Sequence, residues 1–397
     1  MKLESLHLKN FKVFKDARMT DLPSFCVVVG ANGVGKSTLF DIFGFLRDCL
    51  TYNVTRALQS RGGFREMVSR GGEQEKISIE LQYRMPITGK NRLVTYILEI
   101  GLVDGRPVVE QEVLRYKRGA YGSPYQFLNF RRGKGYAITN EEDFDKQDEE
   151  LTREEQTLEA ADILAVKGLG QFQRFKAANS FRQLIENWHV SNFHIDMARG
   201  SKDAAGYADH LSVSGDNLQL VANRLYEEHK QDIFKKIVNA MKRRVPGIAS
   251  INPIPSPDGR LLLGFQDGSF KDPFIDKYVS DGTLKMFAYL VLLYDTQPHP
   301  LLCIEEPENQ LYPQLLMELA EEFRAYSLRG GQVFVSTHSP NFLNAAKVDE
   351  VFWLEKVNGF TQINRARDDA QVKTYMDQGD QMGLLWEQGF FGEAHPQ

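Results

Sequence analysis

Residues 26–40 constrain the fold of this chain more than any other stretch. They open with an apolar, β-branched run at 26–29, which predicts a buried strand. Residues 30–37 then match the pattern G-x-x-x-x-G-K-[ST], and from Ser37 onward the pattern becomes helical. A strand, a glycine-rich loop and a helix in this order favour a phosphate-binding loop over the alternative, an ordinary glycine turn before a helix.

Each residue type in this loop has a physical reason. Glycine has no Cβ, so Gly30, Gly33 and Gly35 let backbone N–H groups turn inward, where they and the positive end of the following helix bind phosphate. Lys36 would reach the terminal phosphates, and the Ser37 hydroxyl would ligate Mg²⁺. We therefore expect ATP and Mg²⁺ as ligands. The expected nucleotide-binding residues of the loop are Gly30, Asn32, Gly33, Gly35, Lys36, Ser37 and Thr38.

Length and charge narrow the class of protein. A chain of 397 residues can bury a large core and is expected to form two lobes rather than one. The formal net charge of −5 gives no overall basic field, so any nucleic-acid surface would be a local patch. Cys26, Cys49 and Cys303 lie in apolar runs without metal-ligand spacing, as in a reduced, cytoplasmic protein. No apolar run approaches membrane-spanning length, and the N-terminus does not resemble a signal peptide.

The chain is expected to fall into three segments. Residues 1–139 form an N-terminal lobe with the phosphate loop and antiparallel strands. Residues 140–270 hold an acidic insert and a helical lobe, and residues 271–397 hold the remaining motifs and a short C-terminal tail.

Within these segments, local patterns predict particular elements. Residues 16–23 are polar and rich in turn formers, and residues 76–139 show the alternation and the Asp-Gly turn of hairpins. The strongly acidic stretch 140–158 is expected to be a solvated insert or helix face at a lobe boundary, because like charges repel. A further hairpin is expected at 247–270, around a Pro-Asp-Gly turn.

Two basic stretches each have two interpretations. The Gly- and Arg-rich residues 54–75 could bring Arg65 or Arg70 to a triphosphate, although a solvated connection is the favoured interpretation. Residues 116–136 interleave basic and aromatic side chains, which could bind a nucleic-acid strand by charge and stacking. An exposed hairpin with one packed aromatic face is the favoured interpretation there.

Three further motifs follow in the C-terminal third. Ser280 and Gly282 stand at the start of an apolar helix, which is an anion-binding geometry or, alternatively, an ordinary helix cap. An apolar strand ends at Glu305 and Glu306, where carboxylates face a ligand beyond the carboxyl end of a sheet. Another apolar strand ends just before His338.

The opening Leu-His-Leu-Lys-Asn-Phe-Lys-Val-Phe at residues 6–14 and the four motifs in this order resemble the SMC/RecF-type branch of the ABC ATPases. The resemblance implies an α/β P-loop NTPase fold of ABC type. In that fold a mixed sheet core is joined by an antiparallel β subdomain and a helical lobe that carries the signature motif. No long heptad region lies between the motifs, so a coiled-coil SMC protein is not expected.

The resemblance also implies a role for each motif. Glu305 would hold Mg²⁺ together with Ser37, and Glu306 would be the base that polarises the attacking water. His338 would be the switch histidine that senses the γ-phosphate, so that Glu306, His338 and Lys36 are the expected catalytic residues. Ser280 and Gly282 would contact the γ-phosphate that is held by a second subunit. Residues 309–312 match the family's D-loop, with Tyr312 where close relatives carry histidine.

As a whole, the chain resembles a compact, stand-alone RecF/OLD-like ATPase, because too few residues follow Pro340 for the Toprim nuclease domain of the OLD nucleases. The resemblance implies an ATP-hydrolysing switch that forms a homodimer or higher oligomer around ATP–Mg²⁺. Such a switch would control a separate effector, possibly a Toprim-like nuclease, in bacterial phage defence. The alternatives are a RecF-like DNA-binding ATPase of repair or replication and a non-hydrolysing nucleotide-gated scaffold. The intact Glu305–Glu306 pair argues against the scaffold.

Overall fold

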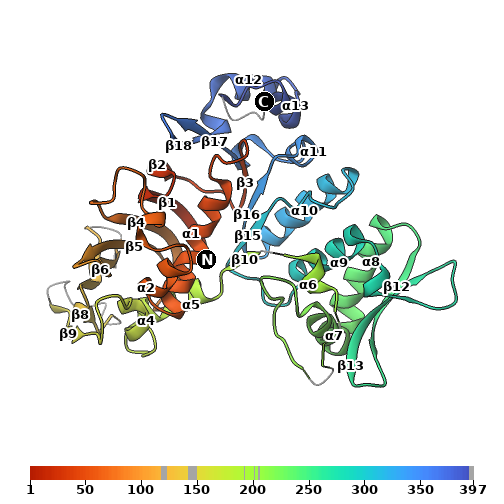
Figure 1. Ribbon diagram of the computed structural model, residues 1–397, viewed down its shortest axis with the longest axis horizontal. Helices are drawn as coiled ribbons and strands as arrows, with labels where there is room; N and C mark the ends of the chain where they lie inside the picture. The colour runs from red at the N-terminus through yellow and green to blue at the C-terminus, as the bar shows by residue number, and fades with distance from the viewer. Residues whose placement is uncertain (118–122, 142–149, 192, 201, 204–205, 393–397) are drawn as a thin grey trace. The chain divides into compact units, whose positions relative to one another are not determined.

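The computed structural model describes residues 1–117, 123–141, 150–191, 193–200, 202–203 and 206–392. The chain divides into two compact units (Figure 1). Unit 1 consists of Met1–Trp188 and Lys347–Gln397, and unit 2 is the intervening His189–Ala346. These bounds differ from the three segments expected from the sequence, whose boundaries stay a prediction.

An antiparallel sheet of eight strands, in the order β2-β1-β4-β5-β6-β7-β8-β9, dominates unit 1. Its strands are β1 (Lys2–Phe11), β2 (Phe14–Met19), β4 (Ile77–Ile87), β5 (Lys90–Val103), β6 (Arg106–Tyr116), β7 (Tyr125–Arg131), β8 (Lys134–Ile138) and β9 (Arg153–Thr157). Alternate residues of β4 are buried, as a strand with one face on the core requires. The hairpins predicted for 76–139 are therefore present.

Two predictions in this sheet are wrong in part, because each missed a strand, although no residue of β9 is buried, as expected of a solvated segment. Part of the expected turn at 16–23 belongs to β2, which pairs with β1 and places a hydrogen bond of 2.7 Å between His7 Nε2 and Asp16 Oδ1. Part of the acidic insert is the strand β9, whose backbone pairs with β8 and whose Arg153 lies 5.0 Å from the ring centre of Tyr136. β2 forms a tight hairpin with β1, directly before it, whereas β9 pairs with β8 across the acidic stretch. Residues 142–149 of the insert lie outside the described residues.

A second group of strands in unit 1 carries the phosphate loop. β3 (Phe25–Val29) is fully buried and pairs in parallel with β17 (Val351–Val357), which pairs antiparallel with β18 (Phe360–Arg365). The helices of this unit are α1 (Lys36–Thr51), α2 (Val54–Gln59), α3 (Phe64–Met67), α4 (Ala165–Leu169), α5 (Lys176–Glu186), α12 (Ala370–Asp377) and α13 (Met382–Glu387). The predicted strand–loop–helix is thus β3, the loop and α1 (Figure 1).

Unit 2 is built on three parallel strands in the order β10 (His189–Ser191), β15 (Leu301–Glu305) and β16 (Gln332–Thr337). A separate antiparallel sheet contains β11 (Lys202–Asp203), β12 (Ile248–Pro255), β13 (Arg260–Asp267) and β14 (Phe274–Ile275), so the hairpin expected at 247–270 is present. The helices are α6 (Ile195–Ala198), α7 (Leu218–His229), α8 (Lys235–Arg244), α9 (Asp281–Leu293), α10 (Gln314–Leu328) and α11 (Pro340–Leu343), and a π-helical turn, Lys230–Phe234, joins α7 to α8.

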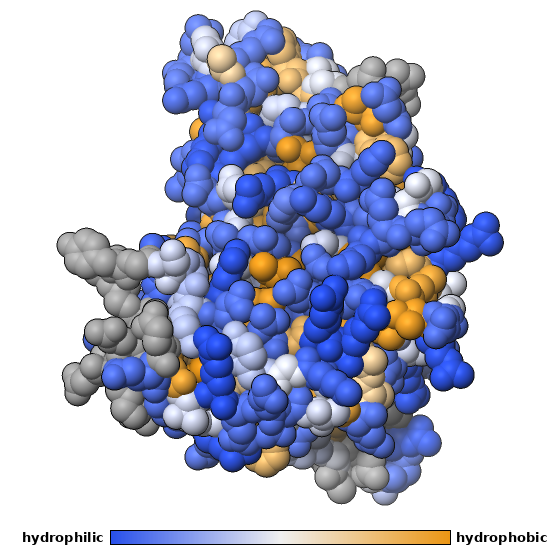
Figure 2. Space-filling view, turned by 90° about the vertical axis from the view of Figure 1, so that its left-hand side faces the viewer, coloured by the Kyte–Doolittle hydropathy of each residue, from blue (hydrophilic) through white to orange (hydrophobic). Residues whose placement is uncertain are grey.

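The apolar and aromatic residues mostly serve packing. Cys26, Cys49 and Cys303 are buried, as expected of small core residues. In the basic–aromatic stretch, the buried rings of Tyr116 and Phe127 stack with centres 3.8 Å apart, which supports the packing interpretation for its described residues. Figure 2 shows a face that is mainly hydrophilic, with small, separated hydrophobic patches. Among the described residues, no helix combines the length and the apolar character needed to cross a lipid bilayer.

Candidate nucleotide site

The phosphate loop between β3 and α1 has a conformation that only glycine adopts without strain at two positions. Gly33 and Gly35 have φ angles of 75° and 111°. A Cβ on Gly35 would also lie 2.7 Å from Cγ2 of Val13, and one on Gly30 would lie 2.9 Å from the backbone oxygen of Leu354. These glycines let the backbone curl where side chains would collide, which is the shape predicted for a phosphate cradle.

Lys36 is the first residue of α1 and is 6% exposed. Its Nζ donates hydrogen bonds to the carbonyl oxygens of Gly30 at 2.7 Å and of Ala31 at 3.2 Å, so the ammonium lies within the curve of the loop. Neither a capping side chain nor an acidic residue occupies the N-terminus of α1. A positive helix end and a held ammonium suit the terminal phosphates of a nucleotide. Asn32 and Ser37 are exposed beside them.

Contacts from distant parts of unit 1 brace the loop. Thr361 of β18 is buried, and its hydroxyl donates a hydrogen bond of 2.5 Å to the carbonyl oxygen of Val34. One turn into α1, Asp41 accepts from Lys12 Nζ and from Arg61 Nε, both at 2.7 Å. The loop is thereby held between the N-terminal sheet and the C-terminal strands of the same unit. Preorganisation of this kind lowers the cost of ordering the loop around phosphate.

In unit 2, Glu305 ends the buried strand β15, and Glu306 follows with a φ of 43°. A non-glycine residue in this left-handed region costs on the order of 1–2 kcal/mol and is often found at functional sites. The Glu306 N–H donates a hydrogen bond of 2.9 Å to the carbonyl oxygen of Ser336, which fixes the turn against the end of β16. The turn thus places Glu306 beside the end of β16.

The structure brings Glu306 and His338 together. His338 Nδ1 lies 3.5 Å from Glu306 Oε1 and 3.5 Å from Glu308 Oε1. Glu306 Oε2 accepts a hydrogen bond of 3.0 Å from the side-chain amide of Asn309. Glu308 Oε1 also accepts from the Thr337 hydroxyl at 2.7 Å and from the His338 N–H at 2.9 Å. A carboxylate, an imidazole and an amide thus converge at the carboxyl ends of two parallel strands.

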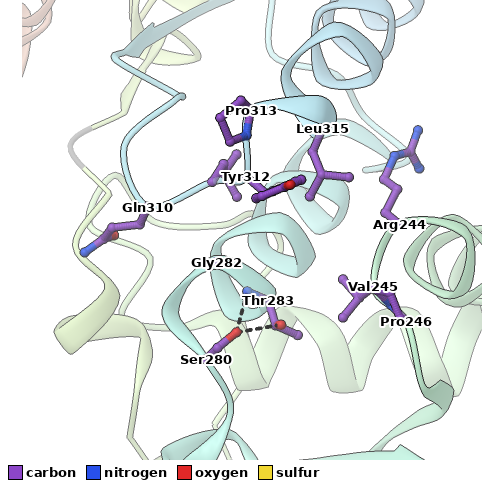
Figure 3. Close-up of a pocket in the computed structure, with 11 residues that line it drawn as sticks. Arg244, Val245, Pro246, Ser280, Gly282, Thr283, Gln310, Tyr312, Pro313 and Leu315 are labelled. Atoms are coloured by element: carbon purple, nitrogen blue, oxygen red, sulfur yellow. Dashed lines mark hydrogen bonds between the residues drawn. The ribbon is translucent and has the colours of Figure 1, made fainter.

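The predicted signature residues begin α9. Ser280 is the N-cap, because its Oγ accepts a hydrogen bond of 3.3 Å from the Thr283 N–H, so the helix-cap interpretation is correct. The anion-binding role remains a prediction. Figure 3 shows the loop around Gln310 and Tyr312 beside this helix start. A cavity of about 480 Å³ is lined by Arg244, Val245, Pro246, Ser280, Gly282, Thr283, Gln310, Leu311, Tyr312, Pro313 and Leu315.

Two residues of the cluster in unit 2 were not predicted. Glu308 holds the backbone of His338, as described above. Lys285 of α9 donates a hydrogen bond of 2.7 Å from Nζ to the carbonyl oxygen of Asn309. Burial lowers the pKa of Lys285 to about 8, against the charges of Glu308 and Glu306, which raise it. Lys285 stands inside an otherwise apolar run of the sequence, and this signal could have identified it as a candidate site residue.

The two arginines considered for the transition state lie in unit 1. Arg70 pairs with Glu66 at 2.7 Å, and both side chains are exposed. Arg70 is therefore solvated, but the stretch around it is not a solvated connection throughout, because α2 and α3 bury Leu58 and Met67. Among the described residues, no group of three or more His, Cys, Asp or Glu side chains is arranged to hold a metal ion by itself.

The motifs are distributed over both units. Gly30, Asn32, Gly33, Gly35, Lys36, Ser37 and Thr38 belong to unit 1, and Ser280, Gly282, Glu305, Glu306 and His338 belong to unit 2. Their assembly into one nucleotide site is a proposal, to which we return below.

The comparisons with known proteins agree with this fold. The family model described as "AAA domain, putative AbiEii toxin, Type IV TA system" matches residues 25–344, which include all four motifs. A solved structure of an Smc head bound to the C-winged helix domain of ScpA is similar, with 14% identity, a TM-score of 0.55, and coverage of 91% of this chain and 97% of that one.

A second similar structure is an Smc head domain with an extended coiled coil, bound to the C-terminal domain of ScpA derived from Pyrococcus furiosus. It has 14% identity and a TM-score of 0.51, and the match covers 95% of this chain and 100% of that one. At this identity the likeness shows the fold, that of an SMC-head-like ABC ATPase. No curated protein matches the chain's sequence.

Proposed function

The chain belongs to this family of AAA domains, and we propose that it is an ATP-hydrolysing switch that pairs with a second copy around ATP–Mg²⁺ and controls a partner protein. The observation that carries the proposal is the convergence of Glu306, His338 and Asn309 at the ends of β15 and β16. In a P-loop ATPase, that position is where an attacking water must be oriented.

The residues fit the chemistry of phosphoryl transfer, which needs positioning and charge neutralisation rather than covalent catalysis. Lys36 and the backbone of the phosphate loop would hold the terminal phosphates. Glu306 would polarise the attacking water, and His338 beside it would contact the γ-phosphate. Ser37 and Glu305 are the expected ligands of Mg²⁺, which when bound neutralises charge on the phosphate oxygens.

Pairing of two chains would complete each site. Ser280 and the backbone at Gly282 lie at the start of the 13-residue helix α9, on the cavity shown in Figure 3. In the proposed pair they would contact the γ-phosphate that is held by the other copy. Nucleotide binding would then favour the closed pair and hydrolysis would release it, because ATP stabilises only the closed arrangement.

Control of a partner is supported by the comparisons. The family description names a toxin–antitoxin system, and both similar Smc heads were solved bound to ScpA domains. The proposed partner is a separate effector, nuclease-like and acting in phage defence. A RecF-like DNA-binding ATPase is the less favoured alternative, because the net charge of −5 leaves only a local basic patch to bind DNA.

The experiment is ATP turnover by the purified chain and by Glu306→Gln, which keeps the size of the side chain and removes its charge. We expect turnover by the wild type and a loss of about 100-fold or more in the variant, as for a residue that acts in the transition state. ATP binding should change little. Equal turnover by both proteins would show that Glu306 is not the base, and no turnover by the wild type would refute the ATPase.

A further inference from the structure

Lys285 is the one charged residue in the apolar stretch 284–293 of α9. It is 6% exposed, and its Nζ lies 5.7 Å from the ring centre of Tyr289. Taking an ammonium group out of water is strongly unfavourable unless other groups compensate for the lost solvation. A methionine or leucine would fill the same space without that cost. The presence of a lysine here therefore calls for a function of its charge.

The charge of Lys285 is directed at the loop after β15. Its Nζ donates to the carbonyl oxygen of Asn309 at 2.7 Å, and the charges of Glu308 and Glu306 favour the protonated form against the effect of burial. Asn309 in turn donates its side-chain amide to Glu306 Oε2 at 3.0 Å. A continuous path of two hydrogen bonds thus runs from α9, through Asn309, to the carboxylate proposed as the base.

The same helix and loop also touch near the N-terminus of α9. A Cβ placed on Gly282 would lie 2.6 Å from the carbonyl oxygen of Gln310, so the two backbones pack without room for a side chain. Figure 3 shows this helix start below the loop that carries Gln310 and Tyr312. Lys285 and Gly282 are three residues apart on one helix face, and they hold two consecutive residues of the loop.

We propose that Lys285 is a positioning residue that fastens the loop bearing Glu306 to the helix that begins with Ser280 and Gly282. The proposal rests on the proposed function. It adds that two groups of the same chain move as one rigid body. Glu306 acts in one nucleotide site, and Ser280 with Gly282 contacts the nucleotide of a second site. A shift of α9 on pairing is therefore transmitted to Glu306 of the same chain.

The consequence for kinetics is specific. The residues expected to bind most of the nucleotide lie in the phosphate loop, in unit 1, whereas Lys285 acts on the orientation of Glu306. Loss of the Lys285 charge should therefore lower kcat and leave KM almost unchanged. A lysine that served only to fill space would give the same kinetics when replaced by methionine.

The test compares the steady-state kinetics of ATP hydrolysis for the wild type, Lys285→Met, Lys285→Arg and the control Lys242→Met, which replaces an exposed lysine of α8. We expect Lys285→Met to lower kcat about 10- to 100-fold, as misplacement of a reacting group does, with KM within about 3-fold. Lys285→Arg should recover most of the loss, and Lys242→Met should match the wild type. A kcat within about 2-fold of wild type for Lys285→Met, or a rise in KM alone, would overturn the proposal.

Two additions keep the test decisive. Asn309→Ala interrupts the path at an exposed residue, so the protein should fold and show the same kcat defect even if Lys285→Met does not fold. Amide hydrogen exchange of Lys285→Arg and Lys285→Met needs no turnover: exchange in residues 306–311 should be wild-type in the first and faster in the second, because only the first keeps the charged donor to the Asn309 carbonyl. If the wild type fails to hydrolyse ATP, the proposed function fails, while unchanged exchange in Lys285→Met would overturn this inference alone.

Discussion

Gly282→Ala is the substitution whose effect follows most directly from the structure. The added Cβ would lie 2.6 Å from the carbonyl oxygen of Gln310, and ordinary contacts of a Cβ begin at 3.4 Å, so the two backbones must separate by up to 0.8 Å, the difference of these distances. Both sides are main chain, so no flexible side chain can move aside. Overpacking of this kind costs about 1–3 kcal/mol.

The assay is amide hydrogen exchange across α9 and the loop at 306–311. A cost of 1–3 kcal/mol corresponds to a loss of protection of about 5- to 150-fold in these two segments. The matched control is Gly200→Ala, because no atom lies within 4 Å of a Cβ at that position. Its exchange should equal that of the wild type. ATP turnover should fall up to about 100-fold in Gly282→Ala, since displacements near 1 Å cost this much.

The reasoning would be refuted if Gly282→Ala kept wild-type protection in both segments. It would then follow that the contact with Gln310 relaxes without cost and that α9 and the loop are not held together there. Equal losses of protection in Gly282→Ala and Gly200→Ala would also contradict the explanation by close contact. The effect would then come from the backbone preference of alanine.

Two further predictions concern unit 1. Lys36→Ala should weaken ATP–Mg²⁺ binding about 10- to 100-fold in isothermal titration, because it removes a charged hydrogen-bond donor; unchanged affinity would refute the site. Burial raises the pKa of Glu112 from 4.5 to about 7. The protonated carboxyl therefore contributes stability that is fully present below pH 4.5 and is lost as the pH rises through 7. In urea unfolding, the free energy of unfolding should fall between pH 4.5 and 8 by ~3 kcal/mol more in the wild type than in Glu112→Gln. Equal losses would contradict this.

The elements that the sequence predicted well are those determined by neighbouring residues. The strand before Gly30, the helix from Lys36 and the cap at Ser280 each depend on a few consecutive side chains. β2 and β9 were missed because their polar composition favoured turns or solvated chain, although β2 pairs with the neighbouring β1 and β9 with β8. Tertiary pairing thus overrode local preference in both places.

The candidate site divides in the same way. Glu306 and His338 could be named from motif order, but the left-handed backbone of Glu306 and its contact with His338 follow only from the packing of β15 beside β16. The links of Lys285 to Asn309 and of Gly282 to Gln310 join segments more than 20 residues apart. No spacing rule in a single sequence reports such contacts.

In the proposed mechanism, ATP closes two chains into a pair and hydrolysis reopens it. The most direct measurement is the solution mass of Glu306→Gln, by light scattering, with and without ATP–Mg²⁺. We expect ATP–Mg²⁺ to double the mass of this variant and to leave the mass of the combined variant, Lys36→Ala with Glu306→Gln, unchanged. A mass that is the same with and without ATP–Mg²⁺ would contradict the claim.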